Sequence, residues 1–247
     1  MKSDDSIYEK QFVIETSQCD AKGSWRLSAA LEAMQITANE HCRLLQIGRN
    51  DLEKAGLLWV LFRTDIEWNR YPRIGETVTI KTFMKGMNLK FFPRYFVFCD
   101  QNGATIGKAG SLWMMIDQIT RKSVSAKDYG FEIPNADQAA PIRIAFVENK
   151  VKGASRSSQY APQYSDFDAN GHVSNVRYAD WLCNNLGVDF MSENDISFAS
   201  IVYRNEILPG NIVKNSFTVS DHEFRFSGYV DGKQFFDIYG ITAELSL

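Results

Sequence analysis

Three polar side chains stand at alternating positions in one short segment of the chain. Asp168, Asn170 and His172 are separated by the small residues Ala169 and Gly171. In extended backbone, alternate side chains project to one side. A carboxylate, an amide and an imidazole that share one side can deprotonate water, attack a carbonyl carbon or orient a reacting group. The alternative is an ordinary loop, but three such groups together favour a catalytic site.

A helical pattern follows this segment, with apolar residues spaced by threes and fours as far as Leu186. We expect Ser174 or Asn175 to cap that helix and to leave backbone N–H groups free at its beginning. Such donors stabilise the negative oxygen that forms when a carbonyl is attacked, and one donor typically lowers the barrier by about 2.7–4 kcal/mol. Gly171 can bring the backbone close to a ligand.

Several other chemistries find no support in the sequence. The cysteines lie at 19, 42, 99 and 183 without a CxxC pair, and the chain has no HExxH, GxSxG or phosphate-binding glycine motif. We therefore expect free thiols, no metal and no cofactor. The net charge is only −3 and no apolar run reaches 18 residues, so we expect neither a nucleic-acid partner nor a membrane span.

The chain reads as two copies of one unit. The segment Cys19–Trp25 is similar to Phe167–Val173, and a helical pattern follows each of them. Strand-like runs come next in both halves, separated by hairpin signals such as Asn102-Gly103 and Asp231-Gly232. We therefore predict an α+β fold of two tandem units, in each of which an antiparallel sheet wraps a long helix.

We place the first unit at residues 1–132, a polar crossover linker at 133–155 and the second unit at 156–247. The first copy has Lys22 and Ser24 where the second has an amide and an imidazole. The sequence thus predicts one active site per chain, in the second unit, with the first unit forming the substrate channel. Most aromatic and Met residues in strands are core, but these could line that channel: Trp59, Phe62, Phe91, Phe92, Trp113, Met114 and Met115.

Two motifs carry a specific resemblance. The segment from Asp168 to Trp181 matches D-x-N-x-H-V-N-N-x-x-Y-x-x-W except that Ser174 replaces the first Asn of the pair, and Tyr203–Glu206 matches Y-R-x-E. Both resemble motifs of plant and bacterial acyl-acyl-carrier-protein (acyl-ACP) thioesterases. Further similarity at Leu58-Trp59-Val60 and at Leu112–Met115 extends the resemblance over nearly the whole chain.

The resemblance implies a double hotdog fold and four site residues, namely Asp168, Asn170, His172 and Glu206. It implies hydrolysis of fatty acyl-ACP to free fatty acid and holo-ACP, with a 4'-phosphopantetheine-linked acyl carrier protein as partner. Plant members often carry Cys directly after the glutamate, but this chain has Ile207. A cysteine mechanism is therefore excluded there. Either Asp168 attacks the carbonyl to form an anhydride, or a carboxylate deprotonates water.

Other functions fit the same motifs less well. They are hydrolysis of acyl-CoA or aryl-CoA, dehydration of 3-hydroxyacyl thioesters, and non-catalytic binding of acyl thioesters. The polar N-terminus carries neither a signal peptide nor a transit peptide, so we expect a bacterial cytoplasmic protein, either a monomer or a homodimer. The sequence does not fix the preferred acyl chain length.

Two smaller expectations complete the analysis. We expect His41, on the apolar stripe of the first helix, to be a hydrogen-bonded core residue. The crossover and its edges have a basic bias, which includes Arg121 and Lys122. Because acyl carrier protein is acidic, we interpret these two residues as part of a docking patch.

Overall fold

The computed structural model describes residues 5–144 and 151–244, and its elements follow one another as two similar series. The first series is β1 (Ile7–Val13), η1 (Thr16–Gln18), α1 (Leu27–Leu44), α2 (Arg49–Lys54), β2 (Leu57–Trp68), β3 (Thr77–Met84), β4 (Phe92–Cys99), β5 (Thr105–Asp117) and η2 (Ala126–Tyr129). The second is β6 (Ser155–Tyr160), η3 (Tyr164–Asp166), α3 (Arg177–Leu186), α4 (Val188–Glu193), β7 (Asn194–Tyr203), β8 (Val213–Ser220), β9 (Glu223–Val230) and β10 (Lys233–Glu244).

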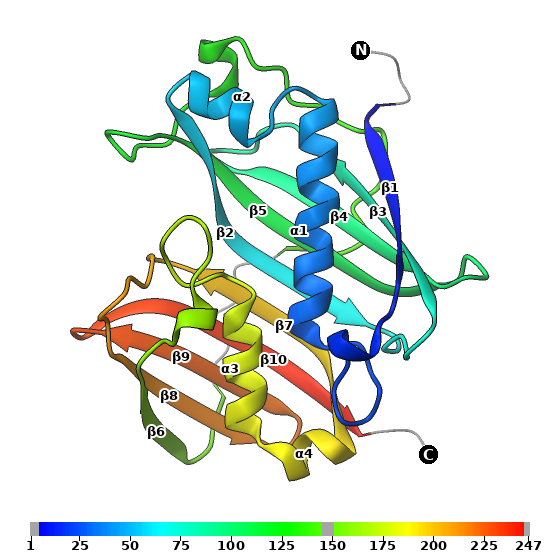
Figure 1. The fold of residues 1–247 in the computed structure, drawn as a ribbon, viewed down its shortest axis with the longest axis vertical. Coiled ribbons are helices and arrows are strands. Elements are labelled where there is room, and N and C mark those ends of the chain that lie inside the picture. The colour runs from blue at the N-terminus through cyan, green and yellow to red at the C-terminus, as the bar shows by residue number, and fades with distance from the viewer. Residues whose placement is uncertain (1–4, 145–150, 245–247) are drawn as a thin grey trace.

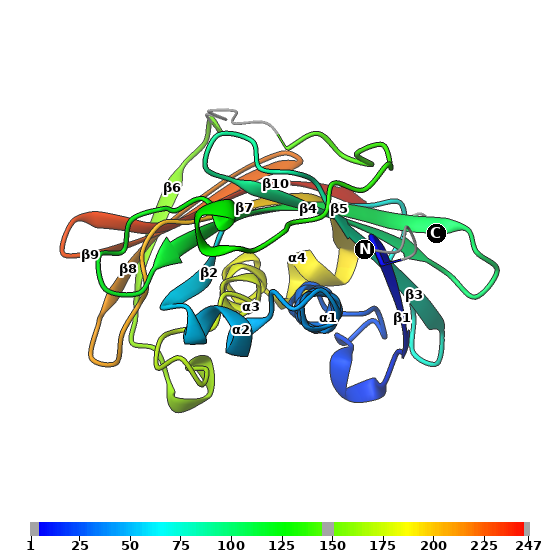
Figure 2. The same ribbon diagram turned by 90° about the horizontal axis from the view of Figure 1, so that it is seen from above.

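All strands join in one antiparallel sheet whose order is β1-β3-β4-β5-β2-β7-β10-β9-β8-β6. The order on one side of the centre mirrors the order on the other, strand for strand, and β2 and β7 lie side by side at the centre (Figure 1). Both long helices cover the same face of the sheet (Figure 2). The main core fills the space between that face and the helices, and it is continuous across the two halves.

The central strands meet through a short antiparallel ladder that runs from Arg63 opposite Val202 to Glu67 opposite Phe198. A buried ion pair lies within it, with Arg63 Nε 2.7 Å from Asp65 Oδ1 and Asp65 only 1% exposed. Burial raises the pKa of Asp65, while Arg63 and Ser200 act against that rise. The central ladder therefore contains a buried charged pair on β2 as well as apolar side chains.

The long helices form where the sequence predicts them, because one face of each is apolar. In α1 the residues Leu27, Leu31, Met34 and Ala38 are buried at spacings of three and four. In α3 the buried face centres on Trp181. Replacing one of these buried apolar residues with a small polar one would uncover part of the sheet face beneath the helix.

The predicted α+β class and the antiparallel strands are confirmed. The short helices α2 and α4 were not predicted from the sequence. The predicted linker 133–155 lies partly outside the described residues, at 145–150, and its last residue is the first of β6. No helix in the described part of the chain is both long and apolar enough to cross a bilayer.

His41 is a hydrogen-bonded core residue, as predicted. It is 1% exposed, and Nε2 lies 2.9 Å from the carbonyl oxygen of Asp5 while Nδ1 lies 3.0 Å from Nη1 of the buried Arg94. Since a guanidinium only donates, Nδ1 is the acceptor and the ring is neutral. Burial, together with the charge of Arg94, lowers the pKa of His41 to about 4.

A depressed histidine pKa makes stability depend on pH. Between about 6.5 and about 4 the unfolded chain binds the proton and the folded chain does not, so the free energy of unfolding falls as the pH falls through this window. The shift corresponds to about 3 kcal/mol across the window. We predict that His41→Gln, which keeps an acceptor and a donor, flattens this dependence.

Urea unfolding at several pH values between 4 and 7 measures the effect. His222→Gln is the matched control, because His222 is exposed and its replacement should leave the wild-type slope intact. Equal slopes for wild type and His41→Gln would contradict the assignment of a neutral buried imidazole.

Candidate active site

The polar segment before α3 forms a tight turn. The Asp168 N–H donates to the His172 carbonyl at 3.1 Å, and the Gly171 N–H donates to the Asp168 carbonyl at 3.0 Å. Gly171 has a φ of +79°, a region that L side chains rarely adopt. The expectation of extended backbone was therefore wrong: a closed turn, not strand alternation, gathers these residues.

The Asp168 carboxylate is held inside this turn. Oδ1 accepts the backbone N–H of Asn170 at 2.8 Å, and Oδ2 accepts the Asn170 side-chain amide at 3.3 Å. Each carboxylate oxygen has a further lone pair. Asp168 and Asn170 are thus directly paired, and the carboxylate can still act on a substrate atom.

The predicted cap of the following helix was also wrong. The helix begins at Arg177 with Val176 as its N-cap and no capping side chain. The Ser174 N–H donates to the carbonyl of Asp166, and Asn175 Oδ1 instead accepts the side-chain amide of Gln35 at 2.5 Å. Asn175 therefore ties the two long helices together rather than ending one of them.

His172 and Glu206 are distant in the sequence but lie close together in the structure. The Val173 N–H donates to the Ile207 carbonyl at 2.9 Å, which lays the turn beside the loop that follows β7. His172 Nε2 is consequently 4.0 Å from Glu206 Oε1. The same carboxylate oxygen lies 2.6 Å from Nη2 of Arg121, a residue of the first half.

Tyr178, the second residue of α3, is buried and only 3% exposed. Its pKa is raised above the ordinary value by burial first, and then by the negative charges of Asp168 and Glu206. The charges of both carboxylates thus act in the same direction on one buried phenol.

Two hollows flank this region. The larger is a groove of about 420 Å³ between the beginnings of α1 and α3, and Asp168, Arg26 and Arg177 are among its lining residues. The smaller, about 10 Å³, lies under α1, and Trp113 and Tyr203 are among its lining residues. Of the aromatic residues expected at a channel, Trp113 lines this hollow, whereas Trp59 donates to the Ile47 carbonyl and packs against Phe92.

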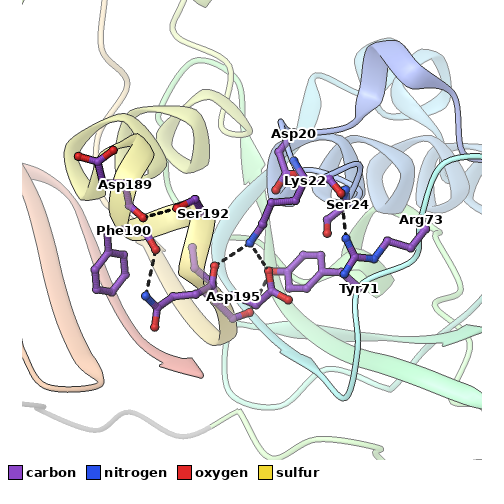
Figure 3. A network of polar contacts seen from close by, with 11 residues as sticks. Asp20, Lys22, Ser24, Tyr71, Arg73, Asp189, Phe190, Ser192 and Asp195 are labelled. Atoms are coloured by element: carbon purple, nitrogen blue, oxygen red, sulfur yellow. Dashed lines mark hydrogen bonds and ion pairs between the residues drawn. The ribbon is translucent and has the colours of Figure 1, made fainter. Parts of the chain in front are cut away.

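The first half contains the same turn (Figure 3). The Asp20 N–H donates to the Ser24 carbonyl at 2.9 Å, the Gly23 N–H donates to the Asp20 carbonyl at 3.0 Å, and Gly23 has a φ of +74°. Asp20 Oδ1 accepts the backbone N–H of Lys22 at 2.9 Å. The predicted correspondence of Lys22 with Asn170, and of Ser24 with His172, is therefore confirmed.

The side chains of this first turn make different contacts from those of the second turn. Lys22 Nζ lies 2.6 Å from Asp195 Oδ1 and donates to the Asn194 carbonyl at 2.7 Å (Figure 3). Tyr71 occupies the position of Glu206, and its hydroxyl donates to the carbonyl of Ile196. This turn thus ties the halves together, and it has no imidazole, because Ser24 stands where the second turn has His172.

The family of the chain is shown by comparison with known proteins. Residues 5–132 match the family model of the acyl-ACP thioesterase N-terminal domain, and residues 149–233 match that of the C-terminal domain. The chain belongs to the acyl-ACP thioesterase family, as its motifs predict.

Individual relatives support this membership. An acyl-ACP thioesterase from Bacteroides thetaiotaomicron is 26% identical with a TM-score of 0.87, and the match covers 98% of this chain and 100% of that one. A palmitoyl-acyl carrier protein thioesterase of Gossypium hirsutum is 25% identical over 88% of this chain. A 12:0-ACP thioesterase from Umbellularia californica shares the fold, with a TM-score of 0.81 and 20% identity over 97% of this chain and 98% of that one. The chain spans 56% of the length of the Gossypium relative.

Sequence reasoning missed some residues of this region. Arg121 was interpreted as a docking residue, yet its guanidinium pairs with Glu206, and Gln35 was not singled out although it bonds Asn175. Neither contact has a local signal, because each joins segments more than 80 residues apart. In the described part of the chain, no group of three His, Cys, Asp or Glu side chains could hold a metal ion.

The repeated turn supplies a matched pair of variants. Gly171→Ala and Gly23→Ala each place a side chain at a positive φ without a severe clash, so each should lower stability by about 1–2 kcal/mol. We predict that only Gly171→Ala also lowers kcat for an acyl thioester, because it distorts the turn that holds Asp168. Chemical unfolding and steady-state kinetics measure the two effects. Equal losses of kcat in both variants would contradict the assignment of the site to the second turn.

Proposed function

We propose that this protein hydrolyses fatty acyl-ACP to free fatty acid and holo-ACP. The observation that carries the proposal is the meeting of the Asp168–His172 turn with Glu206, with 4.0 Å between the imidazole and the carboxylate. Family membership supplies the substrate class, since the relatives named above are thioesterases that act on acyl-ACP. The partner is then an acyl carrier protein that presents the acyl chain on 4'-phosphopantetheine.

We further propose that the architecture is a double hotdog, with units at 1–132 and 156–247 joined by the linker 133–155. The mirrored strand order and the identical turns at Gly23 and Gly171 support this division. Only the second unit carries the complete set of site residues. The first unit contributes the wall that faces it, including Trp113 beside the smaller hollow.

In the proposed reaction, Asp168 acts on the thioester carbonyl. As a nucleophile, its carboxylate adds to the carbonyl carbon, the phosphopantetheine thiolate leaves and takes a proton, and water opens the resulting anhydride. As a general base, it instead takes a proton from the attacking water. Asn170 fixes the orientation of the carboxylate in both routes. His172, beside Glu206, is placed to protonate the leaving sulfur.

Two cysteine side chains support a carboxylate mechanism over a thiol mechanism. Burial raises the pKa of Cys183 to about 12, and it also raises the pKa of Cys19. A thiol with a raised pKa carries little of the reactive thiolate at neutral pH. The position after Glu206 is the buried, apolar Ile207.

The repeated turn again provides the control for a test. Asp168→Ala should lower kcat for acyl-ACP by on the order of 10³-fold or more, because it removes the group that acts on the carbonyl. Asp20→Ala removes the equivalent carboxylate from the first turn and should keep kcat within about threefold of wild type, since that turn has no chemical role. Holo-ACP release followed by mass spectrometry measures both. Near-normal turnover by a folded Asp168→Ala variant would refute the proposed mechanism.

A further inference from the structure

Arg121 reaches the candidate site from the opposite half of the molecule. It follows β5 of the first half, and its Nη2 donates to Oε1 of Glu206 in the second half at 2.6 Å. His172 Nε2 approaches the same oxygen at 4.0 Å. The guanidinium and the imidazole therefore converge on one carboxylate oxygen, and any movement of Arg121 would change what His172 faces.

The turn that presents Arg121 is firmly built. Asp117 Oδ1 accepts the backbone N–H groups of Ile119 and Thr120, at 3.1 and 2.7 Å. The Arg121 N–H donates to the Asp117 carbonyl at 3.0 Å, and the Asp117 N–H donates to the Lys122 carbonyl at 3.0 Å. Arg121 itself has a φ of +57°, which is costly for a residue with a side chain. The fold thus holds Arg121 in a strained conformation that aims it across the junction.

The pair does little for stability. The side chains of Arg121 and Glu206 are 49% and 44% exposed, and ion pairs of that exposure are screened by solvent and contribute little to stability. What the pair does change is the local charge and the direction of one carboxylate. A guanidinium at hydrogen-bond distance restricts the rotation of the carboxylate that it contacts.

We propose that Arg121 is a positioning residue, which holds the Glu206 carboxylate toward His172. The active site is then built from residues of both halves. The inference rests on the proposed hydrolase function. It replaces the docking role expected from sequence, because the guanidinium is already engaged by a site residue. The step it serves is protonation of the leaving thiolate by His172, whose orientation depends on a fixed Glu206.

The test separates positioning from docking by using two substrates. Arg121→Met is assayed with acyl-ACP and with the acyl-N-acetylcysteamine thioester of the same chain, which has no carrier protein. We expect kcat to fall by about tenfold or more on both substrates, because a misplaced catalytic group affects the chemical step. Arg121→Lys, which keeps the charge, should restore part of kcat.

Arg49 provides the matched control. Its Nε lies 2.6 Å from Glu53 Oε1 in a surface pair that is 63% and 44% exposed, outside the candidate site. Arg49→Met should leave both kcat values unchanged. A raised KM for acyl-ACP alone, with normal kcat on the small thioester, would show a docking residue and overturn the proposal. Unchanged kinetics in Arg121→Met would overturn it as well.

A readout without turnover keeps this inference distinct from the proposed function. The chain has 3 histidines, of which His41 is buried and His222 exposed, so the ring resonances of His172 can be assigned by substitution. These resonances should shift in Arg121→Met and stay in place in Arg49→Met. A wild-type protein that hydrolyses neither substrate would refute the function, while unshifted His172 resonances would refute the role of Arg121.

Discussion

The pairing of β2 with β7 is the constraint on which the rest of the structure depends. It joins two half-sheets into one, and the buried Arg63–Asp65 pair lies on β2 within this ladder. Because the halves are fixed there, each can reach into the other. Lys22 of the first half meets Asp195 of the second on one side of the junction, and Arg121 meets Glu206 on the other.

The same backbone turn supports structure in one half and proposed chemistry in the other. In both copies a glycine at positive φ and an aspartate that accepts its neighbours' N–H groups close the turn. These are local requirements, and they leave the intervening side chains free to differ. In the first half, Lys22 of the turn forms an ion pair with Asp195 of the second half. In the second half, Asn170 and His172 of the turn form a polar cluster beside Glu206.

Local pattern in the sequence predicted much of the fold and singled out Asp168, Asn170 and His172, whereas Glu206 was expected only from the resemblance to a known family. Helix α1 and the strands follow from apolar periodicity, and the turn motif marked Asp168 and His172. The conformation of that turn was mispredicted because alternating polar residues also occur in hydrogen-bonded turns, where Gly171 supplies the positive φ. The role of Arg121 could not be predicted, since its contact with Glu206 exists only once the halves pair.

The central claim is that a polar cluster assembled at this junction cleaves the thioester of an acyl carrier protein. The most direct measurement compares kcat/KM for acyl-ACP and acyl-CoA of the same chain over a series of chain lengths, with release of holo-ACP and free fatty acid followed by mass spectrometry. We predict that the folded protein hydrolyses acyl-ACP, and that kcat/KM is higher for acyl-ACP than for acyl-CoA of the same chain length. Holo-ACP release no faster than in the enzyme-free blank, across all chain lengths, would contradict it.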